Sequence, residues 1–195
     1  MGKLAAPARP RLTSLNHSFT LDLVICCRAG ADEALDLMRS MMSRLKLTVN
    51  ETKTGVCHLP EDKFDFLGYT FGRCYSPKTG RAYCSTTPSK KRVQRLCKAI
   101  REMTRRSQTQ QDAATLVAAL NRKINGWANY FCLGPVSNAY RAVEQHTCRR
   151  LGQWLCVKHK ERAGGNTQFP QQALHQKFGL VRLTTRTRSL PWAKA

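Results

Sequence analysis

Acidic side chains are scarce in this sequence, and they are scarcest in its second part. The chain of 195 residues has 12 aspartates and glutamates against 33 lysines and arginines. Residues 1–72 contain nine basic and eight acidic side chains, whereas residues 73–195 contain 24 basic and four acidic ones, a net charge of +20. Such a charge repels itself unless a polyanion compensates it, and nucleic acid is the usual polyanion. The composition therefore predicts that the second part binds nucleic acid.

Features of secreted and membrane proteins are also missing. The apolar runs are far shorter than the roughly 18 residues of a membrane span, and the N-terminus has no secretory h-region. The nine cysteines are an odd number and fall mostly in apolar stretches. We therefore expect reduced thiols, a cytoplasmic protein and no membrane partner.

No arrangement of side chains for nucleophilic or metal chemistry is visible either. The sequence has no Ser-His-Asp pattern, no glycine-rich phosphate loop and no HNH-type cluster. Four nearby side chains have the residue types of a zinc site, but on one continuous helix they cannot converge on an ion. They are His146, Cys148, Cys156 and His159. We expect no metal site in this chain.

The first part of the chain begins with a segment of low structural content. Residues 1–18 contain two prolines and no periodicity, so we expect an unstructured leader. The apolar run LDLVIC at 21–26 then predicts a buried strand. Helical spacing over 28–47 predicts an amphipathic helix. The apolar face of that helix is expected to consist of Ala34, Leu37, Met38, Met41 and Leu45.

Strands are predicted after this helix. A strand, a turn and a second strand are expected over 47–59, which completes a β-α-β unit. FDFLGYTFG at 64–72 predicts a strand pair with a kink at Gly68, and Asp65 should point outward from it. CYSPKTGRAYCST at 74–86 has the composition of a hairpin.

From Pro88 onward the apolar period becomes 3.6 residues and predicts three helices. They are expected over 88–106, 112–131 and 136–160, with Ser137 or Asn138 available to cap the third. A short helix or strand is expected near the C-terminus. The residues predicted to form the apolar stripes are Val93, Leu96, Cys97, Ile100, Met103, Leu116, Leu120, Ile124, Trp127, Phe131, Tyr140, Val143, Trp154 and Leu155.

Basic residues cover most of the remaining surface of the first of these helices. A charged stripe is often only a solvated face, but solvated faces normally mix signs. Here Glu102 alone interrupts the basic run over 90–106, which favours contact with phosphates. On the next helix, Asn125, Asn129 and Tyr130 project away from the apolar stripe and are further contact candidates. Gly126 is expected to allow close helix approach.

Several segments, taken in this order, are similar to one known family. LKLTVNETKTGVCHL and FDFLGYTF resemble the end of a polymerase palm; PSKKRVQRLCKAIREMTRR, INGWANYF and RRLGQWL resemble a thumb or maturase-specific domain. GLVRLTTRTRSLPWAKA looks like the end of members that lack a DNA-binding and endonuclease tail. Residues 19–195 thus resemble the reverse transcriptase/maturases encoded by group II introns.

The resemblance implies both a fold class and a division into domains. The expected class is α+β, in which a partial β-α-β palm remnant with hairpins precedes a three-helix thumb/maturase bundle. Residues 1–18 would be the leader and 19–86 the C-terminal part of the palm. Residues 87–163 would form the helical maturase-specific thumb domain, and 164–195 a C-terminal extension.

The same resemblance implies that the polymerase site is incomplete. In the family, a Tyr-Ala-Asp-Asp hairpin and a further aspartate hold two Mg²⁺ ions, which need several oxygen ligands close together. Phe19-Thr20-Leu21-Asp22 matches that hairpin. Leu21 replaces the first carboxylate, and the fingers and the remaining aspartate have no counterpart upstream. Asp22 is therefore interpreted as a vestigial catalytic residue; the other interpretation is that it is an incidental strand residue. This chain alone is expected to bind no cofactor.

The expected function is that of a truncated maturase that binds group II intron RNA and assists its splicing, without independent polymerase activity. Two alternatives remain open. In the first alternative, the chain is a degenerate gene fragment with no activity. In the second, it completes an RNA-directed DNA polymerase in trans with a separate fingers and palm polypeptide. The residues predicted to bind RNA are Lys90, Lys91, Arg92, Arg95, Lys98, Arg101, Arg105, Arg106, Arg122, Lys123, Asn129, Tyr130, Arg149 and Arg150.

Overall fold

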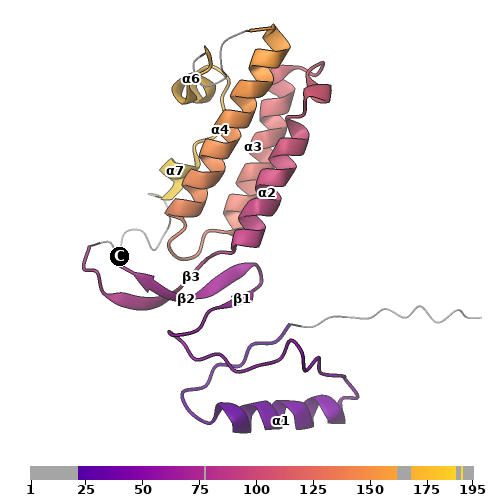
Figure 1. Cartoon of the computed structure of the whole chain (residues 1–195), viewed down its shortest axis with the longest axis vertical. Coiled ribbons are helices and arrows are strands. Elements are labelled where there is room, and N and C mark those ends of the chain that lie inside the picture. Colours follow the sequence, from indigo (N-terminus) through magenta and orange to yellow (C-terminus); the bar gives the residue numbers. More distant parts are fainter. Residues whose placement is uncertain (1–21, 77, 162–167, 188–189, 191–195) are drawn as a thin grey trace, which may run out of the picture.

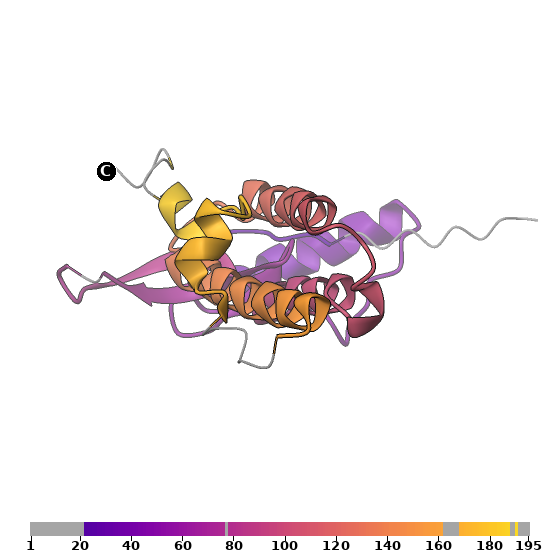
Figure 2. The ribbon, with the colours of Figure 1, turned by 90° about the horizontal axis from the view of Figure 1, so that it is seen from above.

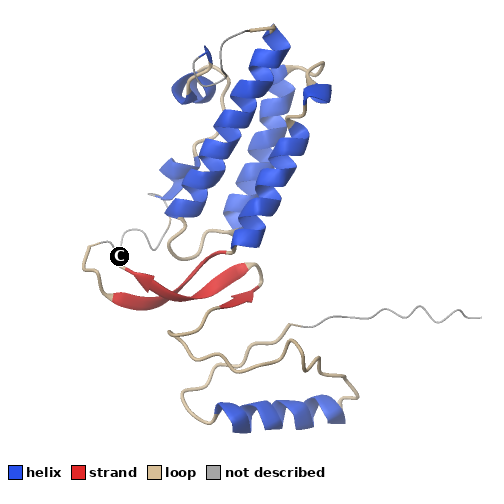
Figure 3. Cartoon of the chain, viewed as in Figure 1, coloured by secondary structure: helices blue, strands red, loops and turns tan. Residues whose placement is uncertain are grey.

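The structure is a computed structural model that describes residues 22–76, 78–161, 168–187 and 190. Figures 1 and 3 show a helical bundle above a small sheet, with one separate helix below the sheet. The elements are α1 (Ala31–Arg44), β1 (Phe64–Phe66), β2 (Tyr69–Tyr75), β3 (Ala82–Pro88), α2 (Lys90–Met103), η1 (Arg106–Gln108), α3 (Ala113–Tyr130), α4 (Ser137–His159), α6 (Gln171–Gln176) and α7 (Leu183–Arg186). This mixture of helices and a small sheet agrees with the predicted α+β class.

The three strands form one antiparallel sheet in the order β1-β2-β3. Leu67 and Gly68, both with positive φ, make the turn between β1 and β2, and Phe64 stacks on Phe71 across that pair. Asp65 is exposed and accepts a hydrogen bond from the Thr70 hydroxyl. The predicted strand pair and hairpin are therefore confirmed, as is the outward orientation of Asp65.

The core of the molecule lies among α2, α3 and α4. Each helix contributes the apolar stripe that its 3.6-residue period predicts, and the side chains of Ile100, Leu120 and Leu155 are completely buried. Trp127 and Phe131 pack together at a ring distance of 5.0 Å. The Tyr140 hydroxyl donates to the carbonyl groups of Ala128 and Phe131, so it joins α4 to the end of α3. The predicted bundle is confirmed.

The C-terminal segment lies over α3 and α4. Figures 1 and 2 show α6 and α7 on one side of the bundle, next to α4. Leu174, Leu180 and Leu183 are buried and belong to the same core cluster as the three long helices. On α3, Asn121 bonds the segment twice: its amide donates to the Gly179 carbonyl and its carbonyl accepts from the Val181 N–H.

The first part of the chain differs from prediction. Residues 22–27 and 47–59 form no strand, so the described residues contain no β-α-β unit. Because these segments have no neighbouring strand to pair with, their backbone groups remain outside any sheet. The helix itself is confirmed as α1, but it has no buried residue.

The apolar face predicted for α1 is largely open to solvent. Leu37, Met41 and Leu45 are 64%, 52% and 63% exposed, while Met38 is half-buried. Amphipathic spacing predicts the helix correctly, but it cannot show whether another element covers the apolar side.

Two details of the bundle were also predicted wrongly. Neither Ser137 nor Asn138 caps α4: Val136 occupies the N-cap position, and no side chain accepts a hydrogen bond there. A Cβ added at Gly126 would meet no atom within 4 Å, so this glycine permits no close helix contact. No helix in the described segments is long and apolar enough to span a bilayer.

Candidate nucleic-acid interface

The exposed side of α2 is rich in basic side chains. Ser89 occupies the N-cap position of this helix, and the helix turns Leu96 and Ile100 into the core, which leaves its cationic side chains outside. Most of the cations predicted to bind RNA are exposed here. These exposed residues are Lys90, Lys91, Arg92, Arg95, Lys98, Arg101, Arg105 and, just beyond the helix, Arg106. Arg105 pairs with Glu102.

Three arginines predicted from separate segments come together where α2 packs on α4. Burial lowers the pKa of Arg150, and the positive charges of Arg101 and Arg149 lower that pKa further. Among the described residues, none of the three guanidinium groups forms a salt bridge with a carboxylate. Like charges held close together without a counter-ion make a strong site for an anion such as phosphate.

Arg150 also has a structural role. Its Nε donates to the Thr104 hydroxyl at 3.1 Å and its Nη2 donates to the Thr104 carbonyl at 2.9 Å. These bonds satisfy backbone and side-chain acceptors at the C-terminus of α2, where a cation is favoured by the helix dipole. Arg150 therefore joins α2 to α4 and holds its positive charge at that junction.

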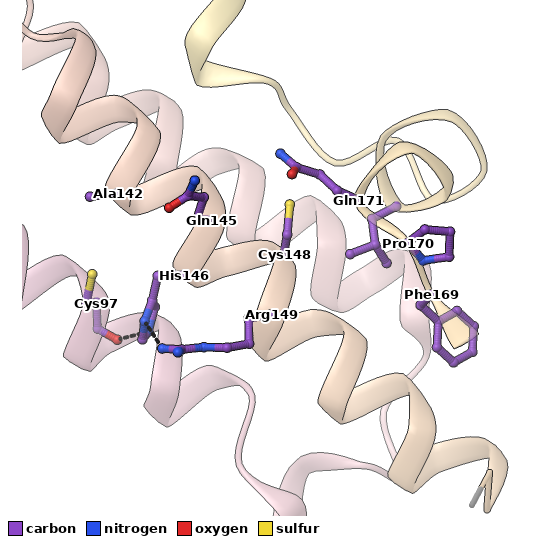
Figure 4. Close-up of a pocket in the computed structure, with 10 residues that line it drawn as sticks. Cys97, Ala142, Gln145, His146, Cys148, Arg149, Phe169, Pro170 and Gln171 are labelled. Atoms are coloured by element: carbon purple, nitrogen blue, oxygen red, sulfur yellow. Dashed lines mark hydrogen bonds between the residues drawn. The ribbon is translucent and has the colours of Figure 1, made fainter. Parts of the chain in front are cut away.

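His146 links the two helices through a chain of hydrogen bonds (Figure 4). Its Nε2 lies 3.1 Å from the Cys97 carbonyl oxygen, and its Nδ1 lies 3.4 Å from Nη2 of Arg149. Because a carbonyl can only accept, Nε2 carries the proton, and Nδ1 of the neutral ring accepts from Arg149.

Burial lowers the pKa of His146, and the neighbouring positive charges of Arg149, Arg101 and Arg150 lower it further; the hydrogen bond to Cys97 acts in the opposite direction. The ring therefore stays neutral near pH 7 and fixes the guanidinium group of Arg149.

The other predicted contact residues lie apart from this cluster. Arg122 and Lys123 are exposed on α3. The Asn129 side-chain carbonyl accepts a 2.6 Å hydrogen bond from Nη2 of Arg186. The Tyr130 hydroxyl donates to the Leu67 carbonyl at 2.9 Å, which places this ring against the turn of the sheet. These four residues do not join the arginine cluster.

The residue interpreted as a remnant of a polymerase site does not meet other metal ligands. Asp22 is exposed in an irregular segment, and Phe19, Thr20 and Leu21 lie outside the described residues. No group of three or more His, Cys, Asp or Glu in the described part of the chain is placed to hold a metal ion. The donors present do not fit the two Mg²⁺ ions of an intact polymerase.

His146 is a residue of the candidate site that sequence reasoning missed, because it was considered only as a zinc ligand. The usable signal is its spacing of three residues from Arg149, which puts both side chains on one face of α4. Its second partner, the Cys97 carbonyl, belongs to another helix and has no signature in the sequence.

Part of the chain is similar to a known protein family. Residues 93–169 match the family described as "Group II intron, maturase-specific domain"; no curated protein matches the chain. The matched segment begins in α2 and ends just before α6, so it contains the junction of Arg101, Arg149 and Arg150. The resemblance drawn from the sequence is thus confirmed for residues 93–169, which are similar to the maturase-specific domain of group II intron proteins.

Proposed function

We propose that this protein binds group II intron RNA through α2 and α4 and helps that RNA to adopt its splicing-competent fold. The observation that carries the proposal is the cluster of Arg101, Arg149 and Arg150, which lies inside the matched domain without a carboxylate partner among the described residues. The cationic side of α2 extends the cluster along the helix. Such a surface neutralises phosphates, and the shape of the folded RNA then supplies selectivity.

The mechanism is electrostatic docking. Each lysine or arginine that meets a phosphate releases condensed counterions, so affinity falls steeply as salt rises. The protein contributes no reacting group: the RNA performs the transesterification with its own Mg²⁺ ions, and the protein stabilises the RNA conformation in which this happens.

Measurement of RNA affinity against salt concentration tests the proposal. A triple variant, Lys98→Gln/Arg101→Gln/Arg149→Gln, should bind a group II intron RNA more weakly and should lower the slope of log K against log salt by about 2 units, since each lost phosphate contact removes about 0.7–0.9. The matched control is Arg28→Gln/Arg44→Gln/Lys53→Gln, which removes the same charge from exposed positions outside the domain. Equal losses of affinity in both variants would show that binding depends on net charge and not on this site. Equal binding of the wild-type protein to an unrelated RNA of the same length would contradict selectivity for the intron.

The proposed function includes no polymerase activity for this chain alone. Of the aligned hairpin, Phe19-Thr20-Leu21-Asp22, only the last residue can bind a metal. Residues 19–86 would be the end of a palm and 87–163 the thumb, acting in the cytoplasm. A wild-type preparation should give no primer extension with Mg²⁺.

The exposed apolar side of α1 favours a second candidate function. Leu37, Met41 and Leu45 lie open on one helix, as expected of a palm fragment that a separate fingers and palm polypeptide would cover. Co-expression with such a polypeptide should then give primer extension, and Leu21→Asp should increase it. If neither the wild-type chain nor Leu21→Asp gives primer extension on co-expression, this second candidate function is wrong. That result would not affect the proposed RNA binding.

A further inference from the structure

A groove of about 650 Å³ lies beside the arginine cluster, between α4, α2 and the segment that leads into α6 (Figure 4). Its volume falls within the range of sites that hold a molecule of nucleotide size. The two sides of the groove differ in chemistry. His146 and Arg149 form one side, and Phe169 and Pro170 form the other.

The polar side presents a fixed cation. Arg149 is exposed, and its guanidinium group is held by the neutral imidazole of His146, which is itself bonded to the backbone of α2. Arg101 adds positive charge to the same region, because it acts on the ionisation of both Cys97 and His146. A phosphate that enters here meets a cation whose orientation is already set.

The opposite side presents an aromatic ring. Phe169 is half-buried and packs edge-on against Phe178 at 6.0 Å, and its other neighbour is His159 at 6.1 Å. These contacts fix the ring while part of it still lines the groove. A fixed and partly open aromatic ring is the usual platform on which an unpaired base stacks.

The remaining lining carries no negative charge. Burial raises the pKa of the Cys148 thiol to about 12, so this group stays neutral. Gln145 is exposed at the groove, with an amide that can both donate and accept hydrogen bonds. Gln171 already donates to Glu144, which leaves its carbonyl oxygen as an acceptor.

We propose that this groove captures one unpaired nucleotide of an RNA strand, with its phosphate on Arg149, its base against Phe169 and its base edge near Gln145. This inference rests on the proposed RNA binding, and it adds to that function a place where a base is held as well as a phosphate. RNA is favoured over a free nucleotide because the exposed Arg101 lies one turn along α2 from the lining residue Cys97, where it can hold an adjoining phosphate.

Two single-stranded probes of equal length separate base capture from phosphate binding: an oligouridylate and the same ribose-phosphate chain without bases. The wild-type protein should bind the oligouridylate more tightly than the abasic chain. Phe169→Leu should weaken oligouridylate binding about fivefold or more, as expected for loss of one stacked base, and leave binding of the abasic chain unchanged. Arg149→Gln should weaken binding of both probes.

Two further variants make the result independent of folding defects. Gln145→Ala changes an exposed side chain and should reduce binding of oligouridylate but not of the abasic chain. Phe64→Leu, in β1 and outside the groove, is the matched control and should change neither. If Arg149→Gln weakens both probes while Phe169→Leu and Gln145→Ala weaken neither, base capture is wrong and the proposed function stands.

The remaining outcomes also decide the matter. If Arg101→Gln and Arg149→Gln alter neither probe, the proposed function itself fails. Uridine monophosphate at micromolar concentration should not displace the oligouridylate, because one phosphate releases few counterions. Displacement at that concentration would assign the groove to a free nucleotide and overturn the proposal.

Discussion

Glu144 is a buried carboxylate that holds the C-terminal segment on the bundle. Its side chain is 5% exposed, and its oxygens accept hydrogen bonds from the Gln171 amide and from the backbone N–H and the hydroxyl of Thr184. One acidic side chain of α4 thus binds both α6 and α7. This carboxylate can be buried because it accepts several hydrogen bonds at once and lies 3.6 Å from Nε2 of the buried His175 ring.

Glu144→Ala should lower the free energy of unfolding by about 2–3 kcal/mol, because it removes three hydrogen bonds to a charged acceptor, and water recovers only part of that loss for the exposed donors. Chemical denaturation monitored by circular dichroism measures the change. Glu161→Ala, at an exposed glutamate, is the control and should have little effect. A loss equally small in both variants would mean that the C-terminal segment is held by its leucines alone.

The stability of the protein should depend on pH through His146. Burial, with Arg149, Arg101 and Arg150 nearby, lowers the pKa of this imidazole in the folded protein, against the opposing hydrogen bond to Cys97. In the unfolded chain the pKa is about 6.5. At pH values between these two pKa values, unfolding is therefore accompanied by uptake of a proton. The contribution of the neutral His146 ring to stability is present above pH 6.5 and is lost as pH falls through the folded pKa.

His146→Gln should accordingly lose less stability than the wild type when pH is lowered from about 7 to about 5. Glutamine can still donate to the Cys97 carbonyl, which keeps the two helices joined. His58→Gln removes an exposed imidazole elsewhere and should behave like the wild type. Parallel pH profiles for wild type and His146→Gln would contradict the assignment of a neutral, buried ring.

At the scale of elements, two glycines should respond in opposite ways to the same substitution. Gly126 lies within α3 in open space, and Gly134 has a φ of +73° in the loop between α3 and α4, where a Cβ would overlap the Thr86 carbonyl of β3. Gly126→Ala should stabilise the protein by about 0.5–1 kcal/mol through helix propensity. Gly134→Ala should destabilise it by about 2 kcal/mol through backbone strain and steric overlap. Thermal denaturation of the pair tests whether this loop packs tightly on the sheet; equal shifts would refute it.

The helices and hairpins were predictable because their signals are local. The 3.6-residue period of α2, α3 and α4 and the turn at Gly68 lie within short windows of sequence. The strands expected at 21–26 and 47–59 are absent from the described residues for a physical reason. A strand needs a partner, and an apolar run does not show whether one is present.

The candidate site was predictable only in part. Net charge and helix phase identified Arg101, Arg149 and Arg150 as surface cations. Their convergence depends on how α2 packs against α4, and so does the bond between His146 and the Cys97 carbonyl. The wall formed by Phe169 depends on how the chain returns over α4 after the bundle. These are tertiary contacts between distant segments, which no periodicity encodes.

At the scale of the whole molecule, the uneven charge should control stability. The second part carries a net charge of +20, which destabilises the compact state through self-repulsion. Raising NaCl from about 0.05 to 0.5 M should raise the melting temperature, since the Debye length falls below the spacing of surface charges. The shift should be smaller in Lys98→Gln/Arg101→Gln/Arg149→Gln, which removes part of the repulsion. A melting temperature that is independent of salt would show that the cations are too far apart to repel.

The two parts of the molecule should also differ in local stability. α1 has no buried residue, whereas α3 and α4 supply most of the core. Local opening free energy follows buried apolar contact, so amides of α1 should exchange with deuterium far faster than those around Leu120 and Leu151. Hydrogen exchange with mass spectrometry measures this difference without any substitution. Met41→Asp should leave the protection of the bundle unchanged, since it alters only an exposed side chain, while Ile100→Asp should abolish it. Protection of α1 equal to that of α4 would mean that its apolar side is covered in solution, and the concentration dependence of that protection would then show whether a second copy of the chain covers it.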